Sequence, residues 1–301
     1  MKIFVTGGAG FIGSHLVDRL VSDKNDVIVT DNLYRGKKEN IADHLISGRV
    51  TFYETDIRNY DSVYKAMKDC EIVFHLAAQS NVIGADVDLD YSFGTNVIGT
   101  YNVLKAAKAC GIKRLIFTSS REAYGEAISL PVKEDHPLRS KNFYGASKVA
   151  GEKYCEIYRN MKLLDVVILR LSNVYGPRDA DRVIPIFIDN VRNNKKIKIY
   201  GGRQLIDFIS VEKCVDVLIG SITNQKAVKG ATNIGSGKGT TLFELAERIK
   251  AILNSTTEVT VEPARSTEVV KYVADIKRMS GIFNISINDD PLYFLPGMLK
   301  S

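Results

Sequence analysis

Two side chains in the middle of the sequence could carry out acid–base chemistry together. Tyr144 and Lys148 are four residues apart in a predicted helix over 143–158, so they lie on one face, one turn apart. An ammonium group near a phenol stabilises the phenolate, so Lys148 is expected to lower the pKa of Tyr144. Tyr144 would then be a general base near neutral pH. The spacing alone is common, and a surface pair is the simpler explanation unless another motif supports a site.

A glycine-rich turn near the N-terminus could hold a phosphate group. Gly7, Gly10 and Gly13 lie between a predicted strand over 2–6 and a predicted helix over 11–22. Such a tight turn needs residues without a Cβ atom, and the following helix offers free N–H groups and a positive dipole end to an anion. A lone glycine pattern is weak evidence, but this one has the strand and helix that pyrophosphate binding requires. We therefore predict dinucleotide binding at this turn.

An acidic residue after the second predicted strand indicates which dinucleotide is bound. The strand over 27–30 ends at Asp31, 18 residues after Gly13. A carboxylate at about this distance hydrogen-bonds the adenosine ribose of NAD, and it would repel the additional phosphate of NADP. Arg35 lies four residues further on and keeps NADP open as an alternative. We therefore predict that the cofactor is NAD.

The elements around these residues predict an α/β fold. Short β-branched runs alternate with helical patterns in the first half, which implies a parallel sheet with helices on both faces, a Rossmann-type doubly wound fold. Several strands are apolar at consecutive positions, as expected when both faces are covered. The predicted strands cover residues 2–6, 27–30, 50–53, 72–76, 114–118 and 166–169, and the helices cover 11–22, 61–68, 91–110 and 143–158.

The pattern becomes mixed after about residue 171, which indicates a smaller C-terminal α/β lobe. Short strands over 198–200, 208–211, 232–234 and 258–261 alternate with helices over 183–193, 212–222 and 241–253. We predict an NAD-binding Rossmann domain over 1–170 and a substrate lobe over 171–301, and leave open whether some of its segments return to the main sheet. No flexible linker separates the two, so the cleft between them is the expected ligand site.

Composition excludes several classes of protein. The 301 residues are 45% hydrophobic and 25% charged, as in globular proteins. No apolar run approaches the ~18 residues of a membrane helix, and no secretory signal is present, so we predict a soluble cytoplasmic protein without a membrane partner. The net charge of +6 is scattered, which argues against nucleic-acid binding. The four cysteines lack a C-x-x-C spacing and the four histidines are dispersed, so no metal site is expected.

With these motifs in place, the sequence resembles the extended short-chain dehydrogenase/reductase family. Within it, the sequence is most similar to NAD-dependent nucleotide-sugar epimerases and dehydratases, especially UDP-glucose 4-epimerase-like proteins. The similarity covers nearly the whole chain. It rests on residues 6–15 (TGGAGFIGSH), 31–33 (DNL), 56–57 (DI), 75–79 (HLAAQ), 96–100 (NVIGT), 118–120 (TSS), 123–125 (AYG), 144–148 (YGASK), 170–178 (RLSNVYGPR) and 233–237 (NIGSG).

The resemblance implies an NAD site and assigns its residues. The pyrophosphate would be held by Gly7, Gly10, Phe11, Ile12 and Gly13. The adenosine ribose would be bound by Asp31 and Asn32, and the adenine would be flanked by Asp56 and Ile57. The path to the nicotinamide would be lined by Ala77, Ala78 and Gln79, with Asn96 nearby. Tyr144 and Lys148 would serve both cofactor binding and catalysis.

The resemblance also implies a substrate and a mechanism. Tyr144 would remove a proton from the C4 hydroxyl of a nucleotide sugar, and Ser120 would form a hydrogen bond with this hydroxyl. Tightly bound NAD would oxidise C4 to a 4-keto intermediate. The nucleoside diphosphate would contact Asn173, Val183 and Arg265. The predicted activity is that of a nucleotide-sugar 4-epimerase acting on a UDP-hexose, and a homodimer paired through helices 91–110 and 143–158 is expected.

Glu122 departs from the pattern of simple 4-epimerases, which have a small or neutral residue two positions before Tyr124. Nucleotide-sugar dehydratases and decarboxylases resemble this chain in having a glutamate there, and in a dehydratase it removes the C5 proton. Glu122 is therefore a candidate catalytic residue of a dehydratase or decarboxylase, or it forms only a salt bridge to Arg121. A non-catalytic NAD-binding regulator on the same fold is a remote third alternative.

Two further departures concern the substrate lobe. Ile206 stands before Asp207 where the family has an arginine, and Arg203 is a candidate replacement. The usual terminal helix is replaced by a short segment over 290–297, in which Pro296 is expected to prevent helix formation. A lid over the substrate would then be incomplete or supplied by a dimer partner.

Overall fold

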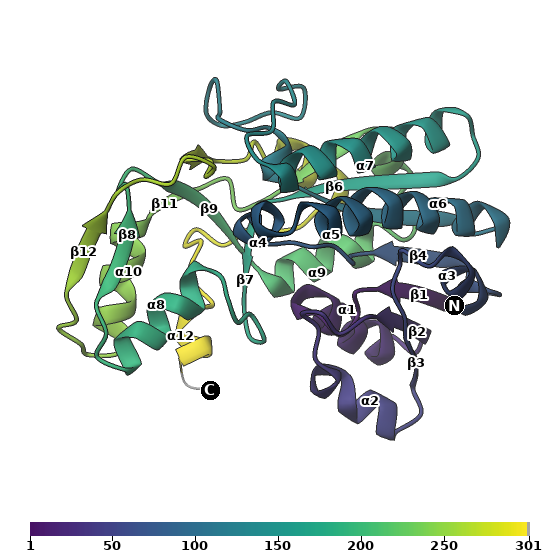
Figure 1. Ribbon diagram of the computed structural model, residues 1–301, viewed down its shortest axis with the longest axis horizontal. Helices are drawn as coiled ribbons and strands as arrows, with labels where there is room; N and C mark the ends of the chain where they lie inside the picture. Colours follow the sequence, from purple (N-terminus) through teal and green to yellow (C-terminus); the bar gives the residue numbers. More distant parts are fainter. Residues whose placement is uncertain (300–301) are drawn as a thin grey trace.

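A seven-stranded parallel sheet forms the larger part of the computed structural model, which describes residues 1–299 (Figure 1). The strand order is β10-β6-β5-β4-β1-β2-β3, and every neighbouring pair is parallel. This confirms the predicted Rossmann-type doubly wound sheet. The strands are β1 (Lys2–Thr6), β2 (Asp26–Asp31), β3 (Val50–Glu54), β4 (Ile72–His75), β5 (Arg114–Ser120), β6 (Asp165–Leu171) and β10 (Ala231–Ile234).

The sheet is buried on both faces, which explains why its strands are apolar at consecutive positions. In β1, Ile3 and Val5 pack into one hydrophobic cluster, and Phe4 between them packs into another on the opposite face. The first cluster includes residues of α1 (Phe11–Ser22) and α9 (Val211–Gly220). The second includes residues of α3 (Tyr60–Met67), α6 (Thr100–Ala109) and α7 (Phe143–Asn160).

The predicted helix over 91–110 is helical along its length, but its hydrogen-bonding pattern changes from α to π and back to α. It consists of α5 (Leu89–Phe93), a π-helical segment η2 (Gly94–Gly99) and α6. Widened π turns occur frequently beside functional sites. Here the segment contains Asn96, one of the predicted site residues. A short helix, α4 (Val82–Val87), precedes it, and α2 (Ala42–Ile46) lies between β2 and β3.

The smaller lobe lies at one end of the main sheet, on the left in Figure 1. Its four-stranded sheet contains β7 (Asn173–Tyr175), β9 (Leu205–Ser210), β11 (Gly239–Thr241) and β13 (Lys271–Tyr272). A parallel pair is formed by β8 (Ile197–Tyr200) and β12 (Val259–Glu262). A third hydrophobic cluster packs α8 (Val183–Arg192), α10 (Leu242–Ile252) and α12 (Leu295–Leu299) together with these strands, while α11 (Lys277–Phe283) packs near β10.

Some segments after residue 171 pack with the large sheet rather than with the smaller lobe. Strand β10 pairs in parallel with β6, and α9 packs against α1. The chain therefore enters the smaller lobe, returns to the main sheet, and enters the lobe again. The exact division at residue 170 stays a prediction, and residues 300 and 301 of the predicted lobe lie outside the described residues.

The expectation that Pro296 prevents a helix is wrong. Helix α12 begins at Leu295, so Pro296 occupies its first turn, where a missing backbone N–H breaks no helical hydrogen bond. The segment around it is anchored to the smaller lobe, because Tyr175 Oη donates to the Pro291 carbonyl at 2.9 Å and Arg192 Nη2 donates to the Leu299 carbonyl at 2.9 Å. Within residues 1–299, no helix is both long and apolar enough to cross a membrane.

Candidate active site

The main cavity lies at the carboxyl ends of the central strands, where the strand order reverses between β1 and β4. Ligands of doubly wound sheets bind at this position. The cavity has a volume of about 920 Å³ and is lined by residues of both lobes. Among the residues predicted from the sequence, it is lined by Gly7, Gly10, Phe11, Ile12, Gly13, Asp31, Asn32, Ile57, Ala77, Ala78, Ser120, Glu122, Tyr144, Lys148, Asn173, Val183 and Arg265.

The glycine turn closes so tightly that side chains are excluded from it. A Cβ atom on Gly13 would lie 2.1 Å from the Gly7 carbonyl oxygen. Gly7 has a φ of +73°, and its Cβ would lie 2.7 Å from the Ala77 amide nitrogen. No side chain caps α1, and its first turn contains no acidic residue, so its N-terminal N–H groups are available to an anion. This cradle fits the pyrophosphate of a dinucleotide.

Asp31 ends β2 at the wall of the cavity, and its carboxylate is held by the backbone. Oδ2 accepts a hydrogen bond from the Ala9 amide at 3.1 Å, and Oδ1 accepts one from the Leu33 amide at 2.9 Å. Burial raises the pKa of Asp31, although these two hydrogen bonds act in the opposite direction. Each oxygen retains a lone pair, so the carboxylate can still accept from ribose hydroxyls.

Asp56 is not among the residues that line the cavity, and its position beside the adenine stays a prediction. Its carboxylate accepts hydrogen bonds from Asn32 Nδ2 at 2.8 Å and from Arg58 Nε at 3.0 Å. Burial acts to raise the pKa of Asp56, but the hydrogen bonds from Arg58 and Asn32 outweigh it and lower the pKa. Asp56 therefore orients Asn32, which does line the cavity, while its neighbour Ile57 reaches the cavity itself.

Gln79 and Asn96 also lie behind the wall rather than in it. Asn96 Oδ1 accepts from the Gln79 amide at 2.7 Å, and Asn96 Nδ2 donates to the Gln79 carbonyl at 3.0 Å. Nδ2 also donates to Ser147 Oγ at 2.9 Å. Because both polar groups of Asn96 are used within the protein, it ties the wall segment after β4 to helix α7 and is not placed to contact a ligand directly.

The predicted catalytic residues converge from two elements. Ser120 ends β5, and Tyr144 and Lys148 lie in the first turns of α7. Asn142 caps this helix, with Oδ1 accepting from the Gly145 amide at 2.8 Å. A Cβ on Gly145 would lie 2.3 Å from the Glu122 carbonyl oxygen, so the glycine lets the helix approach the turn after Ser120. Ser120 and Tyr144 are joined by a side-chain hydrogen bond.

The pKa of Tyr144 is raised, which is opposite to the prediction from its spacing to Lys148. Burial of the phenol is the dominant cause, and the positive charge of Arg182 and the hydrogen bond with Ser120 oppose it only in part. Lys148 Nζ lies 5.7 Å from the centre of the Tyr144 ring and donates to the Thr118 carbonyl at 2.9 Å. Burial lowers the pKa of Lys148 itself to about 8, so this side chain is still mostly charged at neutral pH but loses its proton in mildly alkaline solution.

Glu122 forms the salt bridge that was one of its two predicted roles. Its Oε1 lies 2.9 Å from Arg121 Nη2, and its Oε2 accepts from Asn142 Nδ2 at 2.8 Å. Arg121 in turn donates from Nε to Asn173 Oδ1 at 2.7 Å. These bonds connect the cap of α7 in one lobe to β7 in the other, along the wall of the cavity.

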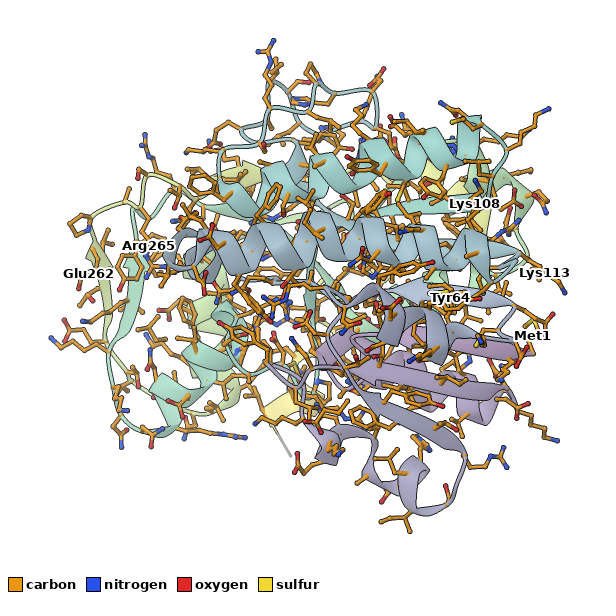
Figure 2. All side chains as sticks on the ribbon, turned by 45° about the vertical axis from the view of Figure 1, so that its right-hand side comes forward. Met1, Tyr64, Lys108, Lys113, Glu262 and Arg265 are labelled. Atoms are coloured by element: carbon orange, nitrogen blue, oxygen red, sulfur yellow. The ribbon has the colours of Figure 1, made fainter. Side chains whose placement is uncertain are left out.

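The substrate-lobe wall carries Arg265 but not Arg203. Arg265 lies in the smaller lobe, at the opposite end of the molecule from Met1 (Figure 2). Its Nη1 pairs with Glu268 Oε1 at 3.0 Å, and its guanidinium carbon lies 3.8 Å above the centre of the Tyr200 ring. Arg203 is exposed and does not line the cavity, so it does not replace the arginine expected at Ile206, which lines the wall as a buried apolar residue.

Several charged residues of the cavity were not predicted as site residues. Arg35 donates from Nη2 to Asp181 Oδ1 at 2.5 Å and from Nη1 to Ser80 Oγ at 2.5 Å, which connects the two lobes. Arg182 pairs with Asp179 at 2.9 Å. The signal was present as the charged run over 178–182, directly after the motif ending at Arg178. Among the described residues, no group of three His, Cys, Asp or Glu side chains is placed to hold a metal ion.

Comparisons with known proteins find relatives over nearly the whole chain, and residues 3–235 match the NAD dependent epimerase/dehydratase family. A putative UDP-glucose 4-epimerase of Methanocaldococcus jannaschii is 39% identical over 93% of this chain and 92% of its own. The solved UDP-N-acetylglucosamine 4-epimerase of Methanobrevibacter ruminantium M1 has a TM-score of 0.91 at 33% identity, covering 99% of this chain and 96% of its own. A dTDP-glucose 4,6-dehydratase of Streptomyces venezuelae, with NAD bound, has a TM-score of 0.94 at 27% identity, covering 100% and 96%. Because the family match spans most of the sequence and the fold and glycine turn agree with it, the chain belongs to the NAD dependent epimerase/dehydratase family.

Proposed function

We propose that this protein is an NAD-dependent nucleotide-sugar 4-epimerase that acts on a UDP-hexose. The observation that carries the proposal is the convergence of Ser120, Tyr144 and Lys148 in one cavity with the glycine turn. The same cavity extends into the smaller lobe, as far as Arg265. One site can therefore hold a dinucleotide on one side and a nucleotide sugar on the other, with an acid–base group between them.

NAD fits the part of the cavity formed by the main sheet. The glycine cradle and the uncapped N-terminus of α1 suit the pyrophosphate, and Asp31 suits the adenosine ribose. When bound, NAD supplies a reversible hydride acceptor for the sugar C4 atom and a positive charge within the cavity. We assign the nicotinamide ribose to Lys148, whose Nζ donates to the Thr118 carbonyl.

The residues of the chain handle the proton of the sugar C4 hydroxyl. Tyr144 Oη takes this proton and returns it after the sugar has turned over in the site. Ser120 donates a hydrogen bond to the sugar oxygen and also contacts Tyr144, so it aligns the two oxygens between which the proton moves. Burial disfavours the phenolate, whereas the positive charge of Arg182 favours it. Turnover is therefore expected to depend on positive charge in the cavity.

The geometry of Glu122 favours epimerisation over the alternative of dehydration or decarboxylation. A base that removes the C5 proton needs a carboxylate oxygen directed at the sugar. Both oxygens of Glu122 are held by protein donors, one by Arg121 and the other by Asn142. Breaking this buried arrangement would leave unpaired charge, so Glu122 is better suited to a fixed structural position than to proton transfer.

The proposal also covers the substrate contacts, the oligomeric state and the cellular location of the protein. We assign the nucleoside diphosphate to Asn173, Val183 and Arg265, in a substrate lobe that begins near residue 171. A homodimer is supported by the exposed aromatic rings of Tyr101 and Tyr154 on α6 and α7, each 40% exposed. A cytoplasmic location is likewise a prediction.

Product analysis tests the proposed activity. Purified protein is incubated separately with UDP-glucose, UDP-N-acetylglucosamine, UDP-glucuronate and GDP- or dTDP-hexoses, and products are identified by mass spectrometry and NMR. An isomer of unchanged mass, inverted at C4, is expected. Loss of water or of carbon dioxide would instead establish the dehydratase or decarboxylase alternative. Absence of any reaction, with NAD bound, would support the non-catalytic regulator.

A further inference from the structure

A segment of the smaller lobe lies along the rim of the main cavity. Residues 177–182, which we call the strap, connect β7 to α8 and contain no helix or strand. Figure 1 shows this connection extending from the smaller lobe toward α1. Residues 178–182 all line the cavity, and Arg178, Ala180 and Asp181 are also exposed to solvent. The strap therefore separates part of the cavity from solvent.

The strap is bound to the helix that follows the glycine turn. The Pro177 carbonyl accepts a hydrogen bond from His15 Nε2 at 2.9 Å, and Arg178 Nη1 donates to Asp18 Oδ2 at 2.7 Å. His15 and Asp18 are three residues apart on α1, so their side chains are neighbours on one face of this helix. The amino end of α1 forms part of the pyrophosphate cradle. One end of the strap is thus attached to the element that carries this cradle.

A single arginine attaches the other end of the strap to the main sheet. Arg35 Nη2 donates to both carboxylate oxygens of Asp181, each at 2.5 Å, and Arg35 Nη1 donates to Ser80 Oγ at 2.5 Å. Arg35 lies in the loop after β2, and Ser80 lies in the segment after β4. Strand β1 is between β2 and β4 in the sheet and leads directly into the glycine turn. The Arg35–Ser80 bond therefore joins the loops on either side of the glycine turn, and Asp181 attaches the strap to both.

We propose that the strap, closed by the Arg35–Asp181 contact, retains NAD in the cavity. Arg35 and Asp181 are then positioning residues, because they set how long NAD stays bound and take no part in the transfer of the sugar proton. The inference requires the NAD site alone, and its test needs no sugar substrate. A cofactor that is reduced and reoxidised by the same sugar has to stay in place between the two steps, so slow release suits such a cycle.

The strap can open without unfolding of either lobe. The side chains of Arg35 and Asp181 are 29% and 44% exposed, and those of Arg178 and Asp18 are 31% and 37% exposed. Exposed ion pairs contribute little free energy each, so no single contact fixes the strap permanently. Because the strap contains no helix or strand, its opening breaks no regular hydrogen-bonded element. NAD can therefore be loaded and exchanged, at a rate that these contacts set.

The Asp181→Asn substitution tests the proposal, because the strap and simple charge effects predict opposite results. Protein loaded with radiolabelled NAD is mixed with excess unlabelled NAD, and the label that remains bound is measured over time by filtration. Loss of the strap contact should speed NAD release about fivefold, the scale of one exposed ion pair. If Asp181 acted only through its charge, removing a negative group from a cavity that holds a pyrophosphate would slow release. Unchanged or slower release would overturn the proposal.

A double-variant cycle and a matched control identify the contact. Arg35→Gln should also speed release, and its combination with Asp181→Asn should release NAD no faster than the faster single variant, since both remove one contact. Arg19→Gln is the control, because Arg19 on α1 pairs with Asp216 at 3.1 Å, is similarly exposed at 44%, and does not line the cavity. Its release rate should equal that of the native protein. Multiplied effects in the double variant, or faster release in the control, would overturn the assignment.

Discussion

The two walls of the main cavity are built by different means. The wall at the amino end of α1 is made of backbone, with glycines at positions where a Cβ atom would overlap a carbonyl or an amide. The wall in the smaller lobe is made of paired side chains, including Arg265–Glu268 and Arg182–Asp179. A backbone wall tolerates almost no substitution and suits a ligand that never changes. A side-chain wall can be retuned by single substitutions, as a family with many sugar substrates requires.

The largest effect is expected where the backbone wall is altered. In Gly13→Ala the new Cβ would lie 2.1 Å from the Gly7 carbonyl oxygen, so the turn must move. We expect loss of bound NAD, and with it nearly all activity. The measurement is the amount of NAD released when the purified protein is denatured. Gly281→Ala in α11 is the control, because its Cβ would meet no atom within 4 Å other than those of its chain neighbours and its own helix backbone. Equal NAD contents in the two variants would refute the backbone explanation.

Removing the phenolic oxygen of Tyr144 should slow the proton transfer without changing either wall of the cavity. Tyr144→Phe deletes the proposed proton acceptor and its hydrogen bond with Ser120. We expect kcat to fall by about 10³-fold, within the range of general acid–base catalysis, while NAD remains bound. Steady-state kinetics and NAD content are measured on the same preparation. Activity within a few-fold of the native protein would remove Tyr144 from the base role.

The buried amino group of Lys148 is expected to make the free energy of unfolding depend on pH. Burial lowers the pKa of Lys148 to about 8 from its ordinary value of 10.5. Between these values the unfolded chain holds the proton and the folded chain does not, so Lys148 makes stability rise with pH. The native protein should gain about 3 kcal/mol relative to Lys148→Met between pH 8 and pH 10.5. Urea unfolding of both proteins across this range measures the difference. A constant difference would show that Lys148 is not desolvated as described.

The smallest effect is expected in the side-chain wall. Arg265 is partly exposed and is paired with Glu268, so Arg265→Ala should raise KM for the nucleotide sugar by about tenfold and change kcat little. Arg203→Ala provides the control, because Arg203 is an exposed arginine of the same lobe that does not line the cavity. If both variants show the same KM, Arg265 does not contact the diphosphate.

The contrast between the backbone wall and the side-chain wall also explains how much of the structure could be predicted from the sequence. The strand β1 and the helix α1 were predicted with their observed bounds, because glycine spacing and apolar runs are local consequences of backbone geometry. The interactions of Asp56 and Asn96 depend on which partners the fold brings near, so their hydrogen bonds within the protein could not be read from the sequence, and their places beside the cofactor stay predictions. The Arg35–Asp181 bond was missed for the same reason, since its partners are 146 residues apart.

The pKa of Tyr144 shows why a correct motif can still give a wrong energetic conclusion. Spacing to Lys148 identifies a neighbour, but it does not reveal how much water the fold removes from either group. Burial dominates for both, raising the pKa of the phenol and lowering that of the ammonium. Pro296 illustrates a similar limit. Whether a proline disrupts a helix depends on its distance from the first residue of the helix, and the sequence did not reveal that α12 begins at Leu295.

The return of β10 to the main sheet has a consequence for the order in which the chain acquires its structure during synthesis. Until residues 231–234 have emerged from the ribosome, β6 presents an unpaired edge, and such an edge is a template for pairing with other chains. A truncated product ending near residue 171 would keep that edge permanently. The main sheet thus lacks its last strand until the second half of the chain has been made, and contacts between distant segments of this kind slow folding.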